Sequence, residues 1–353
     1  MWNHSRLLEL LNISHPIIQA GMAGGVTTPA LVAAVSNAGG LGTLGAGYME
    51  PEVIRENLQE IKNSTRKPFG VNVFIPEFPN ATEEEISRVN QLLQPFRNEL
   101  GIKDVTKPQI DESLFEKQIM VIKEQQVPVC SFTFGIPDKD VVQDLKKEGI
   151  VLIGTATTVE EAILNEQYGM DAVVAQGSEA GGHRGTFLNP YSESTIGTMS
   201  LIPQVTDQVN IPVIAAGGIM DGRGVRASMV LGAEGAQLGT AFVTCEESGA
   251  KPQHKAAILH TKETETVLTP SFSGKPARGI RNTFMEKMEG HESELLDYPL
   301  QNSLTKGIRK EAAIQDRPEF MSLWSGQSPR LSRTGSATEI FQSIVSQAER
   351  INS

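Results

Sequence analysis

The chain has 353 residues, of which 39% are hydrophobic, and its formal net charge is -11 at pH 7. This length allows one barrel-sized domain with an appendage, or two ordinary domains. The negative charge argues against a nucleic acid or an anionic membrane as the partner, because like charges repel, and it favours small-molecule ligands.

Short apolar, β-branched runs alternate with helical patterns along the chain, which is typical of parallel βα units. Eight strands follow each other in this rhythm, and each is followed by a helix. This count predicts an α/β fold, a (β/α)8 TIM barrel, because an open doubly wound sheet usually has fewer strands. The predicted strands are 16–20, 40–46, 69–74, 127–132, 150–155, 172–177, 212–217 and 235–240.

Capping signals mark the ends of the intervening helices. A helix starts where a side chain can accept from the first free amides, and it ends where glycine can leave the helical conformation. The start signals are Thr28 before Pro29, Pro51, Thr158 with Glu161 as a capping box, and Asp221, and the stop signals are Gly39 and Gly232.

Two segments interrupt the rhythm. Residues 75–126 form a long insert whose helix begins at the capping box of Thr82 and Glu85, and we expect this helix to lie over the barrel. For residues 246–326 we predict a smaller, mostly helical subdomain that covers the substrate site. A last helix, capped by Ser336, is expected to return to the barrel wall, which gives three parts: 1–245, 246–326 and 327–353.

Functional groups of such a barrel come from the C-terminal ends of its strands, and phosphate sites are common after strands seven and eight. Both of these loops carry glycine here, with Gly217 and Gly218 after the seventh strand and Gly239 before Thr240 after the eighth. Bare backbone amides and a hydroxyl group suit an anion. Glycines that only permit tight turns are the alternative.

A phosphate site beside glycine-lined strand ends suggests a flat phosphorylated cofactor, and flavin mononucleotide (FMN) fits that shape. Asn72 and Gln176 could offer amide groups to the edge of the flavin ring, because an amide both donates and accepts. Met22 ends the first strand at the same edge of the barrel. Polar side chains that merely fill the barrel are the alternative for Asn72 and Gln176.

The segment QGSEAGGHRG, 176–185, sets one histidine among glycines after the sixth strand. Gly181, Gly182 and Gly185 let this loop approach a flat ligand closely, which leaves His183 as its main titratable group. Histidine is the usual residue for moving a proton near neutral pH, and we expect His183 to be catalytic. A structural histidine is the alternative, and Arg184 is either functional or simply solvated.

A glycine-rich motif and the remaining histidines could suggest a nucleotide site or a metal site, but neither interpretation is supported. GLGTLG, 40–45, matches a dinucleotide fingerprint but lies inside a predicted strand after a helix, where the fingerprint should open a helix. The sequence has no Walker A motif, and the other histidines have no metal-ligand spacing, so no metal is expected. These histidines are at positions 4, 15, 254, 260 and 291.

Cysteine content and the apolar runs bear on location. Cys130 and Cys245 are the only cysteines, too few for a disulfide framework or a thiolate metal site, which suits a reducing compartment. No apolar run is long enough to span a bilayer, and the first 16 residues lack the core of a signal peptide. We therefore expect a soluble, cytoplasmic protein.

The residues closely resemble one family, the bacterial-type nitronate monooxygenases. The segments that carry the resemblance span about 12–245 and continue through WSGQ near Trp324: PIIQAGMAGG, SNAGGLGTLGAGY, KPFGVNVF, SFTFG, QGSEAGGHRG, IPVIAAGGI and GAQLGTAF. The resemblance implies an FMN-dependent barrel that oxidises alkyl nitronates with O2 to carbonyl compounds and nitrite. Propionate 3-nitronate is an example of such a substrate.

The resemblance also implies roles for particular residues. His183 would be the catalytic histidine, and the flavin would contact Asn72, Gln176, Gly181, Gly218, Gln237, Leu238, Gly239 and Thr240. The histidine could remove the α-proton of a neutral nitroalkane or position an anionic nitronate, and both roles stay open.

The same motifs resemble a sister family, the FMN-dependent enoyl-acyl carrier protein reductases, which use NAD(P)H. The insert 75–126, the SFTFG strand end and the WSGQ tail favour the monooxygenase. A flavin-binding protein without catalysis is a third alternative. A homodimer is one option for the oligomeric state, which the sequence leaves open.

Overall fold

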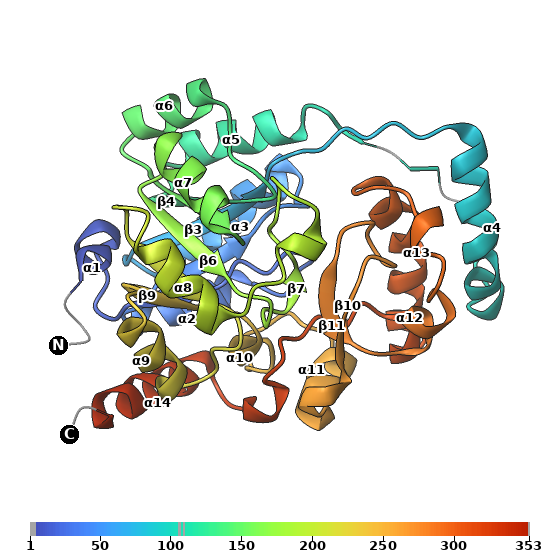
Figure 1. Ribbon diagram of the computed structural model, residues 1–353. Coiled ribbons are helices and arrows are strands. Elements are labelled where there is room, and N and C mark those ends of the chain that lie inside the picture. Colours follow the sequence, from blue (N-terminus) through green and yellow to red (C-terminus); the bar gives the residue numbers. More distant parts are fainter. Residues whose placement is uncertain (1–4, 105–106, 109, 352–353) are drawn as a thin grey trace.

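A computed structural model describes residues 5–104, 107–108 and 110–351 (Figure 1). Its centre is an eight-stranded parallel sheet in the order β1-β9-β8-β6-β5-β4-β3-β2. The strands are β1 (Ile17–Gln19), β2 (Gly42–Gly45), β3 (Phe69–Phe74), β4 (Val129–Thr133), β5 (Val151–Ala156), β6 (Ala172–Gln176), β8 (Val213–Ala216) and β9 (Gly235–Leu238). All eight predicted strands are confirmed, each within two residues at either end.

The sheet closes into a barrel between its first and second strands. Leu41, just before β2, donates its amide to Ile17 O at 3.0 Å and accepts from the amide of Gln19 at 2.9 Å. The buried Gln19 side chain extends this pairing, because its Oε1 accepts from Thr43 N at 3.1 Å. A side-chain amide therefore takes the place of a strand hydrogen bond at the seam, and the predicted TIM barrel is confirmed.

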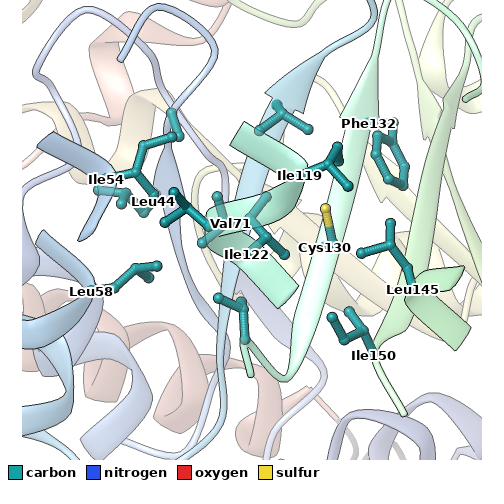
Figure 2. Packing of buried hydrophobic residues seen from close by; sticks show 14 of the residues in the cluster. Leu44, Ile54, Leu58, Val71, Ile119, Ile122, Cys130, Phe132, Leu145 and Ile150 are labelled. Carbon is teal, nitrogen blue, oxygen red and sulfur yellow. The ribbon is translucent and has the colours of Figure 1, made fainter. Parts of the chain in front are cut away.

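Helices surround the barrel and bury their apolar faces against the outward side chains of the strands. They are α2 (Pro29–Asn37), α3 (Pro51–Ser64), α5 (Leu114–Glu124), α6 (Lys139–Lys147), α7 (Val159–Gln167), α8 (Thr198–Thr206) and α9 (Gly222–Val230). Figure 2 shows one part of this layer, where Ile119 and Ile122 of α5 pack beside Val71 and Cys130. Each such side chain contributes about 1.5–3 kcal/mol when fully buried.

The predicted capping residues mostly act as expected. The Thr28 hydroxyl accepts from Leu31 N at 3.1 Å, and Gly39 has the left-handed φ of 99° that ends α2. The box of Thr158 and Glu161 is only half right: Thr158 accepts from Glu161 N at 3.2 Å, but the Glu161 carboxylate does not return to Thr158. It turns instead to the amide of Thr157, at 2.6 Å.

Two terminal helices attach to the barrel. The last helix, α14 (Ala337–Arg350), starts at the predicted capping box of Ser336 and packs on α9 and α2, so its return to the barrel wall is confirmed. The first, α1 (Arg6–Leu11), was not predicted. Its Leu7 and Leu11 are buried against inward barrel residues such as Ile18 and Ile214.

The region after β9 is an appended, mostly helical layer at the mouth of the barrel (Figure 1). It contains an antiparallel pair of strands that the sequence did not predict, and this pair is extended by β7 (Gly182–His183). Its elements are α10 (Thr240–Val243), α11 (Pro252–His260), β10 (Thr266–Thr269), β11 (Ala277–Ile280), α12 (Thr283–Lys287) and α13 (Leu300–Ile314).

The helix of the long insert, α4 (Glu83–Glu99), begins at the predicted capping box of Thr82 and Glu85. Its expected position over the barrel is wrong. Val89 and Leu93 are buried in a cluster with residues of α13, and α4 lies on the outer side of the appended layer (Figure 1). In the described part of the chain, no helix is long and apolar enough to cross a membrane.

Candidate functional site

A deep cavity of about 1340 Å³, counting the part open to solvent, lies between the C-terminal ends of the barrel strands and the appended layer. Nearly all residues predicted for the site line it: Met22, Asn72, Gln176, Gly181, Gly182, His183, Gly217, Gly218, Gln237, Gly239 and Thr240. Leu238 is the exception, because its side chain is buried in the core around Ile17 and Leu31. Side chains alternate along a strand, so Leu238 faces away when Gln237 faces the cavity.

The loops after β8 and β9 form an anion cradle of bare backbone. Gly217 and Gly218 have φ values of 119° and 70°, a conformation that glycine adopts without strain. Among the described residues, the amides of Gly218, Ile219 and Gly239 find no hydrogen-bond acceptor. Such amides need a partner, and a phosphate group is one that fits both their chemistry and their position.

The tail segment around Gly326 closes this cradle from the appended side. Gly326 donates its amide to the Thr240 hydroxyl at 3.0 Å, and Gln327 donates to Glu179 O at 3.0 Å. Gly181 permits this approach, because a Cβ there would lie 2.6 Å from Gly326 N. This contribution of residues 324–328 was not predicted, since the sequence places them nearly 90 residues after β9.

Asn72 reaches the cavity from β3. Its amide NH2 donates to Ser131 Oγ at 3.0 Å and to Thr133 Oγ1 at 3.2 Å, both on β4. The amide is thereby oriented, and its Oδ1 is the atom left for a ligand. Asn72 therefore fills the mouth of the barrel, as the alternative of a structural polar side chain predicts. It also offers a hydrogen-bond acceptor to the cavity.

Gln176 holds the histidine loop rather than facing the cavity with its whole amide. Its Nε2 donates to His183 O at 3.1 Å, and its Oε1 accepts from Gly185 N at 2.8 Å. These two bonds fold the glycine-rich loop back over the end of β6. One N–H of Gln176 remains for a ligand.

Arg184 is fully buried, so the solvated alternative is wrong. Its guanidinium donates to three backbone oxygens: Gly177 O at 2.6 Å, Gln176 O at 3.0 Å and Ser194 O at 2.8 Å. The side chain thus ties the start of the loop to the segment that follows it. Its role is to shape the loop that carries His183.

The buried Glu161 carboxylate fixes the other end of the same loop. One oxygen accepts from Thr186 Oγ1 at 3.0 Å and from the amides of Phe187 and Leu188 at 2.7 and 3.0 Å. These donors replace the water that the carboxylate has lost on burial. This demand explains why Glu161 does not complete the predicted capping box.

His183 stands between the two layers of the molecule. It lies on β7, which pairs with β11 in the register Ala277 with His183, and its Nε2 is 2.8 Å from Ser273 Oγ. The imidazole is ringed by Phe134, Trp324 and Tyr298, with centroids 5.6, 5.5 and 6.1 Å away. Burial, followed by the positive charges of Arg309 and Lys275, lowers the pKa of His183 to about 3.

Two cations lie behind the lining of the cavity. Lys275 is mostly buried, pairs with Glu77, and has its Nζ 5.0 Å above the Phe134 ring. Arg309 of α13 donates to Asn302 O at 2.9 Å and to Asn302 Oδ1 at 2.7 Å. Their field favours an anion near His183 and disfavours a proton on the imidazole. Neither cation was predicted, because site residues were sought at the ends of the barrel strands and both cations belong to the appended layer.

The residues present fit a flat phosphorylated cofactor. The cradle supplies unpaired amides for its phosphate, while Asn72 and Gln176 present polar atoms at the strand ends. His183 and the aromatic side chains stand across the same cavity, which leaves room for a small substrate beside such a ring. In the described residues, no group of three or more potential ligand side chains could hold a metal ion.

Three comparisons with known proteins agree on the relatives of this chain. The sequence model described as nitronate monooxygenase matches residues 4–347. A protein of Staphylococcus aureus (strain N315) named probable nitronate monooxygenase is 53% identical over 352 residues, with 99% of both chains covered. A solved nitroalkane oxidase from Streptomyces ansochromogenes is 38% identical with a TM-score of 0.92, covering 99% of both chains. FabK from Thermotoga maritima is 32% identical with a TM-score of 0.78, covering 99% of this chain and 97% of its own.

Proposed function

Because the chain belongs to the nitronate monooxygenase family, and is thus an oxidoreductase, we propose that it oxidises alkyl nitronates with O2 to carbonyl compounds and nitrite, using FMN. Propionate 3-nitronate is the substrate we put forward for a first test. The observation that carries the proposal is a neutral histidine facing a cavity that also holds an anion cradle and lies in the field of two cations.

The proposed cofactor contacts divide between two ends of the cavity. Gly217, Gly218, Gly239 and Thr240 would hold the phosphate, and Gly181, Gly182, Met22 and Gln237 line the same cavity and would contact the rest of the cofactor. Asn72 Oδ1 and the free N–H of Gln176 would contact the flavin ring. When bound, the flavin supplies one-electron transfer between the nitronate and oxygen.

His183 and the charges behind it act on the substrate. Lys275 and Arg309 create a positive potential that attracts the anionic nitronate into the part of the cavity that carries aromatic side chains. Phe134, Trp324 and Tyr48 exclude water from the reacting atoms and give the alkyl part an apolar surface. His183 is the catalytic residue of this proposal, because it is the titratable side chain of the glycine-rich loop that lines the cavity.

The deciding experiment measures oxygen uptake and nitrite release by the purified yellow protein after addition of propionate 3-nitronate, with no NADH or NADPH present. We expect rapid oxygen uptake with nitrite as a product. No oxygen uptake under these conditions would overturn the proposal.

A second candidate is an FMN-dependent enoyl-acyl carrier protein reductase that uses NAD(P)H. The similarity to FabK supports this candidate. The relative named probable nitronate monooxygenase has the higher sequence identity, 53% against 32% for FabK. Bleaching of the flavin by NADH or NADPH, followed by its recovery with an enoyl thioester, would favour the reductase. The barrel and the flavin site would stand in either case.

A further inference from the structure

We propose that Ser273 is a positioning residue that fixes the tautomer of His183, so that Nε2 carries the proton and Nδ1 is the proton acceptor toward the substrate. Ser273 lies in the appended layer, 90 positions after His183, and its side chain is almost fully buried. The tautomer can be measured whatever reaction the protein catalyses, whereas its effect on turnover rests on the proposed function.

The argument starts from the hydrogen bonds of one hydroxyl group. Ser273 Oγ lies 2.9 Å from Lys275 O, and a carbonyl oxygen can only accept, so the single hydroxyl proton of Ser273 is given to Lys275 O. Lys275 also donates its amide to Ser273 Oγ at 3.3 Å. With that proton on Lys275 O, the imidazole 2.8 Å away donates from Nε2 to the hydroxyl oxygen. The opposite arrangement would leave Ser273 Oγ and Lys275 O 2.9 Å apart with no proton between two oxygens.

The surroundings keep the imidazole neutral, so that only one of its nitrogens carries a proton. Burial and the charges of Arg309 and Lys275 oppose a second proton, and the Glu77 carboxylate is paired with Lys275. Tyr298 faces the ring from the appended layer, and burial raises the pKa of its phenol, so it stays uncharged. With Nε2 protonated, Nδ1 is the basic nitrogen of a ring that lines the cavity.

The backbone holds Ser273 in place for this task. Its turn precedes β11 and is closed by the amides of Ser273 and Gly274, which donate to Pro270 O at 3.1 and 2.7 Å. From this turn the chain enters β11, whose ladder with β7 sets Ala277 beside His183. The hydroxyl and the imidazole are thus brought together by the pairing of two short strands.

An unprotonated Nδ1 suits a neutral nitroalkane better than an anionic nitronate. The α C–H bond breaks, its proton forms the new N–H bond at Nδ1, and its electron pair passes to the nitro group. The products are an imidazolium and a nitronate, and the negative charge of the nitronate beside the ring compensates the second proton that the surroundings alone oppose. A preformed nitronate has no such proton to lose. Substitution of Ser273 should therefore slow neutral nitroalkanes selectively.

The tautomer is tested directly by nuclear magnetic resonance of the flavin-loaded protein labelled with 15N in histidine. At neutral pH we expect the His183 signals, identified by their loss in His183→Asn, to show a proton on Nε2 and none on Nδ1. Ser273→Ala should show a mixture of both tautomers, whereas Ser271→Ala, which removes a buried hydroxyl from the same turn without touching the ring, should leave the pattern unchanged. A wild-type proton on Nδ1, or an unchanged pattern in Ser273→Ala, would overturn the proposal whatever reaction the enzyme performs.

Kinetics test the consequence. With nitroethane, kcat of Ser273→Ala should fall by about tenfold or more, in the range seen when a group that orients a catalytic residue is removed. With ethyl nitronate the same variant should stay within about twofold of the wild type, as should Ser271→Ala with both substrates. Equal losses of kcat with both substrates, or a wild type that does not oxidise nitroethane, would contradict the acceptor role of Nδ1. A wild type that does not oxidise ethyl nitronate would instead refute the proposed function.

Discussion

Gly218 tests the anion cradle at the scale of a single residue. We expect Gly218→Val to purify with most of its flavin lost, because the added Cβ would lie 3.2 Å from Glu179 Cβ and 3.7 Å from Ser328 Oγ and would displace the loop whose amides face the phosphate. Its φ of 70° also adds strain of about 1–2 kcal/mol for a side chain in the left-handed region. The measurement is the ratio of flavin absorbance to protein absorbance after purification.

Gly149 is the matched control for that strain. It has a φ of 73°, it is exposed between α6 and β5, and an added Cβ would meet no atom within 4 Å. Gly149→Val should therefore keep its flavin. If Gly218→Val purifies with full flavin content, the assignment of the phosphate to these loops fails.

His183 should make the protein sensitive to acid. Its pKa is about 3 in the fold and about 6.5 in an unfolded chain, so the unfolded state binds one more proton between these values. The stability from the neutral imidazole is complete above pH 6.5 and is lost as the pH falls. Between pH 7 and pH 5, wild type should lose about 2 kcal/mol more unfolding free energy than His183→Asn.

Urea titrations at the two pH values, with flavin in excess, measure this difference. His260→Asn replaces an exposed histidine at the end of α11 and should behave like the wild type. Equal acid-induced losses in wild type and His183→Asn would show that the imidazole is not kept neutral by the fold.

At this scale, the sequence could predict the residues that follow a strand directly. Gly218, Asn72 and His183 all line the cavity because the ends of parallel strands meet at one edge of the barrel. The positions of Ser273 and Trp324 in the site could not be predicted, because both reach it through tertiary packing, although the WSGQ segment at Trp324 is part of the family resemblance. The hydrogen bonds of the Gln176 side chain to His183 O and Gly185 N could not be predicted either, because they depend on how the loop folds back.

The C-terminal helix offers a test at the scale of an element. Phe341 of α14 is fully buried, and Gly40 leaves room for its ring, because a Cβ there would lie 2.4 Å from it. Phe341→Ala should lower the free energy of unfolding by about 3–5 kcal/mol, since it leaves a cavity between α14 and α2. Urea denaturation measures the loss.

The neighbouring Gln342 is exposed on the same helix and provides the control. Gln342→Ala should change the free energy of unfolding by no more than about 0.5 kcal/mol. Similar losses in the two variants would mean that α14 is not docked through Phe341.

Elements were predictable where composition and spacing repeat. The barrel strands are apolar runs bounded by glycine or proline, and α14 has a clear capping box with Ile340, Phe341 and Ile344 on one face. β7 has only two residues and α1 has six, too short for a period to show. The helix α4 was found from its own pattern, but an apolar face does not say which partner will cover it.

At the scale of the whole molecule, the barrel and the appended layer are joined at the site itself. The barrel supplies the anion cradle and Asn72, while the appended layer supplies Ser273, Trp324 and the two cations. The division at residues 245 and 326 remains a prediction. The sequence could not foresee how closely the parts are joined, because β7 leaves the barrel to pair with β11.

That pairing has a consequence for recombination between relatives. An exchange of the appended layer at a junction near residue 245 would also replace β11, and with it the strand against which His183 is aligned. Substrate range and histidine geometry are thus inherited together. Parents of a productive chimera would need matching β7 and β11 sequences as well as compatible barrels.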